Sequence, residues 1–190
     1  MSFFALFFIC FLALEIAFRV FIEIREVRLG GALDSFAFSR CIPIINDLLP
    51  SEANPNLRAV SQGAFVRAHE KAHKDLHHSI LCYTFKIICA FCLILFLTFA
   101  MRFWELNWFE LLFLFHIFIT ISRLIFHVIC FIEEYEADSF AVEKVHKAVA
   151  LRALDRLIVE EYPRSPLFAF IYRSHPTAKM RKQRIERLYK

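Results

Sequence analysis

The stretch Ser79–Ile132, SILCYTFKIICAFCLILFLTFAMRFWELNWFELLFLFHIFITISRLIFHVICFI, decides the fold of this chain. It holds two apolar runs, residues 79–101 and 108–132, separated by a short polar turn. Each run is longer than the roughly 20 helical residues that cross a hydrocarbon core of about 30 Å. The stretch therefore predicts two transmembrane helices that form a hairpin.

Another apolar run occupies residues 2–24, near the start of the chain. No basic residue precedes it and no small-residue cleavage pattern follows it, so we interpret residues 1–24 as a retained anchor rather than a signal peptide. The chain is 58% hydrophobic, with 24 Phe and only 3 Gly among its 190 residues, which is unlike a soluble protein. We therefore expect an all-α integral membrane protein with three transmembrane helices and a cytosolic helical region.

The positions of Lys and Arg indicate the orientation in the membrane. Residues 25–78 contain seven of them and residues 133–190 contain twelve, whereas the hairpin turn contains only Arg102. Short loops that are rich in Lys and Arg stay in the cytoplasm. We expect the N-terminus and the hairpin turn to lie outside and both polar segments to lie in the cytoplasm, with the protein in the cell (inner) membrane of a bacterium.

The net charge of +4 has a plain explanation in this topology and in contact with anionic lipid headgroups. We therefore expect membrane lipids as partners and no binding of nucleic acid. The cysteines predict no disulfide framework, because Cys41 faces a reducing compartment and the others lie within the apolar runs. Those others are Cys10, Cys82, Cys89, Cys92 and Cys130.

The sequence divides into the anchor, a linker region over residues 25–61 and a third region over residues 62–190 that includes the hairpin. We expect a helix to begin near Gln62 and to run into the second span without a break. The third span is expected to continue as a helix through residues 133–162, part of which is amphipathic. A last, basic helix is predicted after Pro176.

The chemistry begins with the sequence HEKAH, in which His69, Glu70 and His73 form an HExxH motif. On a helix, two histidines four positions apart point the same way, so both imidazoles can bind one zinc ion. Glu70 then lies beside the open coordination position, where it can act as a general base.

The segment EEYEAD after the third span offers a third ligand. Glu134 and Asp138 are again four positions apart, which suits a ligating carboxylate and a second acid that accepts an N–H from a ligating histidine. Glu133 and Glu136 are alternative ligands, although the spacing to Asp138 favours Glu134. Because two spans separate HExxH from EEYEAD, both segments return to the same membrane face.

These motifs, together with SHP at residues 174–176 before a basic helix, resemble the membrane zinc metallopeptidases of the HtpX and CAAX prenyl endopeptidase type. The likeness extends from about residue 62 to the end of the chain. It implies one zinc ion per chain and hydrolysis of protein or peptide substrates by an activated water. The residues that it implies are the zinc ligands His69, His73 and Glu134, the base Glu70, the supporting acid Asp138, and His175 as a hydrogen-bond donor to substrate or oxyanion.

Other features leave alternatives open. The chain could be a non-catalytic membrane interaction protein that keeps a structural zinc hairpin, or a sensor-transducer metallopeptidase, which also combines HExxH with ExxxD. The family's edge strand, which pairs with an extended substrate, is not recognisable upstream of HExxH. His78 matches a recurring histidine of the prenyl-protease branch, and no role is assigned to it.

Charged side chains within the spans are costly and need partners. Glu15 and Arg19 are one turn apart in the first span and are expected to pair. We expect Arg123 in the third span to anchor the hairpin by pairing with Glu15 or with a backbone carbonyl.

Overall fold

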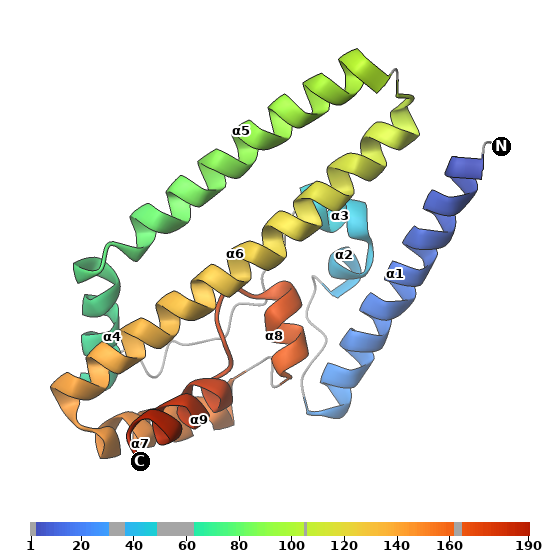
Figure 1. Cartoon of the computed structure of the whole chain (residues 1–190). Helices are drawn as coiled ribbons and strands as arrows, with labels where there is room; N and C mark the ends of the chain where they lie inside the picture. The colour runs from blue at the N-terminus through green and yellow to red at the C-terminus, as the bar shows by residue number, and fades with distance from the viewer. Residues whose placement is uncertain (1–2, 31–36, 49–62, 105, 162–164) are drawn as a thin grey trace.

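The computed structural model describes residues 3–30, 37–48, 63–104, 106–161 and 165–190. Across these residues the regular structure is entirely helical, without a strand, which confirms the predicted all-α class (Figure 1). The helices are α1 (Phe3–Arg28), α2 (Ala37–Cys41), α3 (Pro43–Leu48), α4 (Ala64–Asp75), α5 (His78–Trp104), α6 (Trp108–Val145), α7 (Lys147–Glu160), α8 (Pro166–Tyr172) and α9 (Ala178–Leu188).

Three helices, α1, α5 and α6, are long and apolar enough to cross a membrane, as predicted. Helices α5 and α6 form the hairpin, and the N-terminal end of α1 lies toward the same end of the molecule as the hairpin turn (Figure 1). Large apolar side chains of α5 such as Ile87 and Phe91 are about two-thirds exposed. Such a surface is suited to lipid rather than to water.

Helix α6 is much longer than a membrane span. It begins with a capping box in which Asn107 accepts from backbone N–H groups and Glu110 accepts from the N–H of Asn107. Its 38 residues correspond to about 57 Å, nearly twice the thickness of a hydrocarbon core. The C-terminal turns of α6 therefore extend beyond the predicted span at residues 108–132 and carry the acidic segment with them.

The predicted unbroken helix from HExxH into the second span is wrong. Helix α4 ends at Asp75 and α5 begins at His78, because His77 between them has a φ of 58°. A residue in this left-handed conformation interrupts the helical hydrogen-bond ladder. The break lets α4 pack along α6, separately from α5. The expected start of this helix near Gln62 lies outside the described residues.

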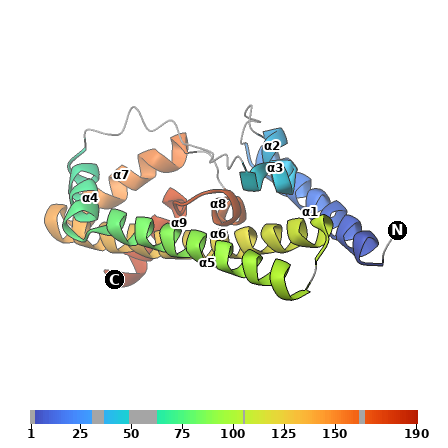
Figure 2. The same cartoon turned by 90° about the horizontal axis from the view of Figure 1, so that it is seen from above.

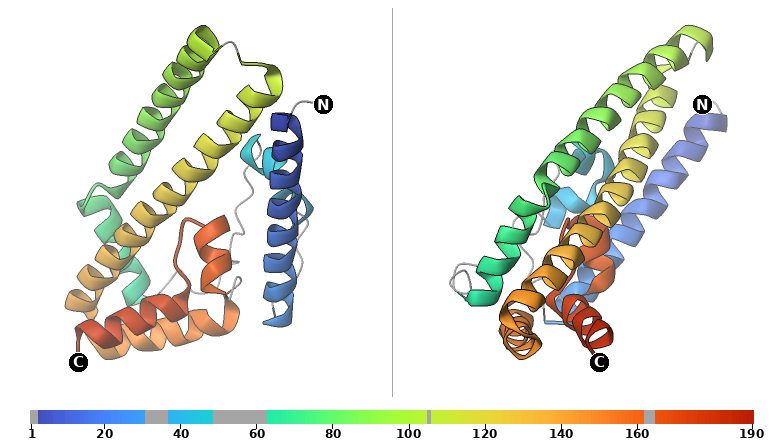
Figure 3. Two further views of the ribbon diagram at one scale, coloured as in Figure 1. Left: turned by 45° about the vertical axis from the view of Figure 1, so that its right-hand side comes forward. Right: turned by 60° about the vertical axis from the view of Figure 1, so that its left-hand side comes forward.

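A second break divides the predicted helix that follows the third span. His146 has a φ of 67°, so α6 ends at Val145 and α7 turns back beneath it (Figure 1). Helices α7 and α9 lie side by side (Figure 3), and α9 begins after Thr177, whose side chain caps it. The predicted amphipathic face is buried here: Leu154 packs with Phe65 of α4 and Ile185 of α9 in one apolar core.

Helices α2 and α3, within the predicted linker region, lie on one side of α6 next to α1 (Figure 2). Arg19 pairs with Glu15 at 2.6 Å, as predicted, and also donates to the Arg40 carbonyl. Arg123 donates to the Asn46 carbonyl and pairs with Asp47, each at 3.1 Å. The expectation that Arg123 binds a backbone carbonyl is therefore confirmed, and Asp47 is a partner that was not predicted.

Helix α8 was not predicted. Ser165 caps its first turn and Pro166 is the first residue of the helix, where proline is favoured. Phe168 and Tyr172 of α8 pack on Ile22 of α1, and the buried carboxylate of Glu26 accepts from the Ser165 N–H. Helix α8 thus connects the first span to the segment that carries His175.

Candidate active site

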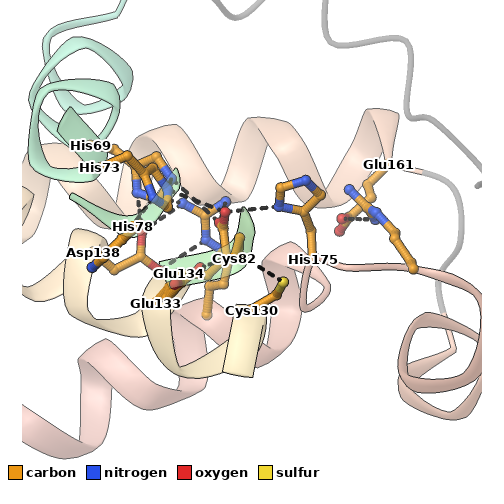
Figure 4. Close-up of polar contacts among 12 residues, drawn as sticks. His69, His73, His78, Cys82, Cys130, Glu133, Glu134, Asp138, Glu161 and His175 are labelled. Carbon is orange, nitrogen blue, oxygen red and sulfur yellow. Dashed lines mark hydrogen bonds and ion pairs between the residues drawn. The ribbon is translucent and has the colours of Figure 1, made fainter. Parts of the chain in front are cut away.

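His69 and His73 project from the same face of α4 toward α6 (Figure 4). Their Nε2 atoms lie 3.1 Å apart. Helix α4 is held in this orientation by Phe65 and Ala72, which are buried on the same side. The helical spacing of HExxH therefore brings both imidazoles to one point, as the sequence predicts.

Glu134 of α6 meets these two histidines. Its carboxylate oxygens lie 3.3 Å from His69 Nε2 and 3.2 Å from His73 Nε2, and the side chain is almost fully buried. Nitrogen and oxygen atoms bound to one tetrahedral zinc at about 2.0–2.2 Å are about 3.3–3.6 Å apart. The two imidazole nitrogens and the Glu134 carboxylate thus lie at separations close to those around one zinc ion, and the donor set fits this metal.

The two alternative carboxylates point elsewhere. Glu133 accepts a hydrogen bond from Cys82, and Glu136 lies 3.4 Å from His78 Nε2. Neither of them is among the ligand atoms that converge with those of His69 and His73. Of the acidic side chains in this segment, Glu134 is the one placed to complete the histidine pair.

Asp138 lies on the far side of the His69 ring, with Oδ1 3.0 Å from His69 Nδ1. Arg181 of α9 donates to both oxygens of this carboxylate, from Nε at 2.8 Å and from Nη2 at 2.5 Å. Burial disfavours the charged imidazolium, but the carboxylates of Asp138 and Glu134 outweigh it and raise the pKa of His69. A metal ligand with such carboxylate partners would be more basic and better oriented, so both acids suit His69 to bind a metal.

His78 contacts the other histidine from the first turn of α5. Its Nδ1 atom lies 2.8 Å from Nδ1 of His73, and its ring is buried. The break at His77 makes this contact possible, because it turns the start of α5 back toward α4. Each histidine of the HExxH motif thus has a neighbour that fixes its ring: Asp138 for His69 and His78 for His73.

Glu70 and His175 line one open pocket of about 440 Å³ beside these residues. Glu70 is exposed on α4, and the side chain of His175, in the turn before α9, is about half exposed. The His175 Nδ1 atom lies 2.8 Å from Glu134 Oε1 (Figure 4). The pocket therefore holds an exposed carboxylate and a half-exposed imidazole beside the converging side chains.

The comparison with protein families agrees with this geometry. A family model described as Peptidase family M48 matches residues 43–189, more than three-quarters of the chain. The chain belongs to peptidase family M48. The resemblance to membrane metallopeptidases of the HtpX and CAAX type is thereby confirmed, and the protein is a metallopeptidase. No curated protein and no solved structure matches the chain.

Two residues around the M48 site were not assigned a role from the sequence. Only the packing of α9 on α6 shows that Arg181 binds Asp138. His78 could not be placed while α4 and α5 were expected to form one helix. The family's edge strand is absent from the described part of the peptidase, which does not include residues 49–62.

Proposed function

We propose that this chain is a membrane-bound zinc endopeptidase that binds one zinc ion through His69, His73 and Glu134. The observation that carries the proposal is the convergence of three ligand atoms from α4 and α6, all within 4.8 Å of one another. Three protein ligands leave a fourth position open, which distinguishes catalytic from structural zinc sites. This also argues against a purely structural zinc hairpin.

Zinc, when bound, supplies a Lewis acid and lowers the pKa of a water from about 15.7 to about 7. The protein's part is to present neutral imidazoles at the Nε2 atoms. His69 does so by donating its Nδ1–H to Asp138, and Arg181 holds that carboxylate in place. His73 donates its Nδ1–H to His78 Nδ1, and His78 in turn directs its Nε2 toward Glu136.

Glu70 is the general base of the proposed reaction. It is adjacent to His69 on the exposed side of α4 and lines the pocket together with His73 and Glu134. There it takes a proton from the attacking water and passes it to the amine that leaves. The reaction proceeds by direct attack of water on the peptide carbonyl, so the enzyme needs no covalent intermediate.

His175 is proposed to hydrogen-bond the substrate or the oxyanion that develops at the attacked carbonyl. Its half-exposed ring stands at the edge of the pocket, 2.8 Å from Glu134. A donor in this place acts on negative charge that grows during the reaction. It therefore contributes to the rate more than to the binding of intact substrate.

We place the active site at the cytoplasmic face of a bacterial inner membrane, with the N-terminus outside. The support is the excess of basic residues in the two polar segments and the course of α6, which leads directly from the third span into the site. Residues 1–24 would serve as the anchor, 25–61 as the linker and 62–190 as the peptidase region. Substrates would be proteins or peptides at the membrane surface.

The substitution Glu70→Gln tests this function. It removes the base without removing a ligand, so cleavage should fall by about 10²- to 10⁴-fold while zinc content stays equal to that of the wild type. Asp75→Asn, which changes an exposed carboxylate on the same helix, is the matched control and should leave both quantities unchanged. Unchanged cleavage by Glu70→Gln would overturn the mechanism.

A further inference from the structure

A second group of metal-binding side chains lies where α5 meets α6, and the proposed peptidase mechanism does not use it. Cys82 comes from the first turns of α5, and Cys130 and Glu133 come from α6. Their ligand atoms all lie within 4.8 Å of one another. Figure 4 shows these residues beside Glu134, on the side of α6 that faces α5.

The spacing of the two sulfurs suits a shared metal ion. Cys82 Sγ lies 3.7 Å from Cys130 Sγ and 3.0 Å from Glu133 Oε2. Two sulfurs at about 2.3 Å from one tetrahedral zinc are about 3.8 Å apart, and a sulfur and a carboxylate oxygen are about 3.6 Å apart. The sulfurs already have the required separation, and the carboxylate needs to move by about half an ångström.

An unpartnered buried atom points independently to a ligand. Glu133 is only 6% exposed, and its Oε1 has no hydrogen-bond partner among the described residues. Leaving a buried carboxylate oxygen without a partner is costly, so such an atom in a native site calls for an explanation. A cation next to the two sulfurs would give this oxygen a partner.

Charge and access also favour a metal at this place. Two thiolates and one carboxylate carry one negative charge more than a divalent ion neutralises. The ammonium of Lys86, one turn after Cys82, lies over the Phe126 ring and lines the same pocket, where it offsets that excess. The pocket is open and is shared with the polar side chains Glu70 and His175, so an ion can reach the cysteines from the side of the proposed active site.

We infer that Cys82, Cys130 and Glu133 form a second metal site, for a thiophilic divalent ion of the class of Zn²⁺ and Cd²⁺. Binding releases one proton from each thiol and ties α5 to α6 through two sulfurs and one oxygen, with water in the fourth position. Thiolate ligands select against Mg²⁺ and Ca²⁺, which prefer oxygen. This site goes beyond the proposed peptidase function and does not depend on metal at His69 and His73.

Titration of the full-length protein with Cd²⁺, which displaces Zn²⁺ from thiolate ligands, in detergent and with a non-thiol reductant, tests the site. The wild type should bind one Cd²⁺ with the ultraviolet charge-transfer band of a thiolate–cadmium bond. Imidazole and carboxylate ligands give no such band, so the signal is independent of the proposed catalytic zinc. The double variant Cys82→Ser/Cys130→Ser should lose the band.

Cys89→Ser/Cys92→Ser is the matched control, since it removes two other thiols of α5 and should keep the band. Glu133→Gln should keep the band but weaken Cd²⁺ binding by at least about tenfold. Removing a residue that only supports a metal ligand already lowers metal affinity by about 10- to 100-fold, and Glu133 is proposed to be a ligand itself. Absence of the band in the wild type, or its persistence in Cys82→Ser/Cys130→Ser, would overturn the inference. Loss of activity in Glu70→Gln bears only on the peptidase mechanism.

Discussion

Asp138 contacts His69 on the side of the imidazole opposite to the proposed zinc, with 3.0 Å between Oδ1 and Nδ1. The two residues come from different helices, α6 and α4, so the contact depends on the packing of these helices rather than on either segment alone. The contact suggests two separate roles that can be tested: His69 binds the proposed zinc, and Asp138 holds the His69 ring in place.

The ligand set predicts which substitutions remove zinc. His69→Ala and Glu134→Ala should each purify with about one zinc per chain less than the wild type, because two remaining ligands hold the ion poorly. Elemental analysis after dialysis measures this. The control is His77→Asn, which changes an exposed histidine next to α4 and keeps a residue that tolerates positive φ. The same zinc content in both alanine variants as in the wild type would show that the ligands lie elsewhere.

The supporting acid predicts a smaller effect. Asp138→Asn leaves all three ligands in place but removes the charge that accepts from His69, so zinc affinity should fall by about 10- to 100-fold. Competition with a metal chelator measures the change. Asp155→Asn alters an exposed carboxylate on α7 and should have the wild-type affinity. Equal affinity of Asp138→Asn and the wild type would contradict the role given to Asp138.

Arg181 is predicted to be important for stability as well as for the site. Arg181→Met keeps much of the packing but leaves the buried Asp138 without its cation, which should lower the free energy of unfolding by about 3–5 kcal/mol. Denaturant titration in detergent measures this. Lys182→Met breaks the neighbouring pair with Asp155 at the surface and should have little effect. Similar stability of the two variants would refute the prediction.

Asp47 of α3 forms a charged cluster with His116 and Arg123 of α6. We expect a substitution in this cluster to lower stability without loss of zinc. Asp47 is fully buried and binds both Arg123 and His116. Asp47→Asn should cost about 1.5–3 kcal/mol for each charged hydrogen bond that is lost, while zinc content remains normal. Thermal unfolding and metal analysis of the same preparation separate the two effects. A variant that lost zinc at full stability would contradict this assignment.

The sequence predicted the parts of this structure that depend on length and periodicity. The span lengths follow from the thickness of a bilayer, and the shared face of His69 and His73 follows from the helical repeat. The breaks at His77 and His146 could not be predicted, because neither residue is Gly or Pro and nothing local in the sequence marks a positive φ there. The pairing of Arg181 with Asp138 could not be predicted either, since it depends on how α9 packs on α6.

The interruption at His77 also separates the orientation of α4 from the length of the α5 span. If α4 and α5 were one helix, each residue inserted in or deleted from the start of the span would rotate His69 and His73 by about 100° around the axis. Because the helix is interrupted at His77, α4 and α5 are oriented separately. The orientation of His69 and His73 is therefore set by the contacts of α4 with α6, and not by the rotation of α5 in the membrane. The length of α5 beyond His78 is therefore free to adapt to bilayers of different thickness without rotating His69 and His73.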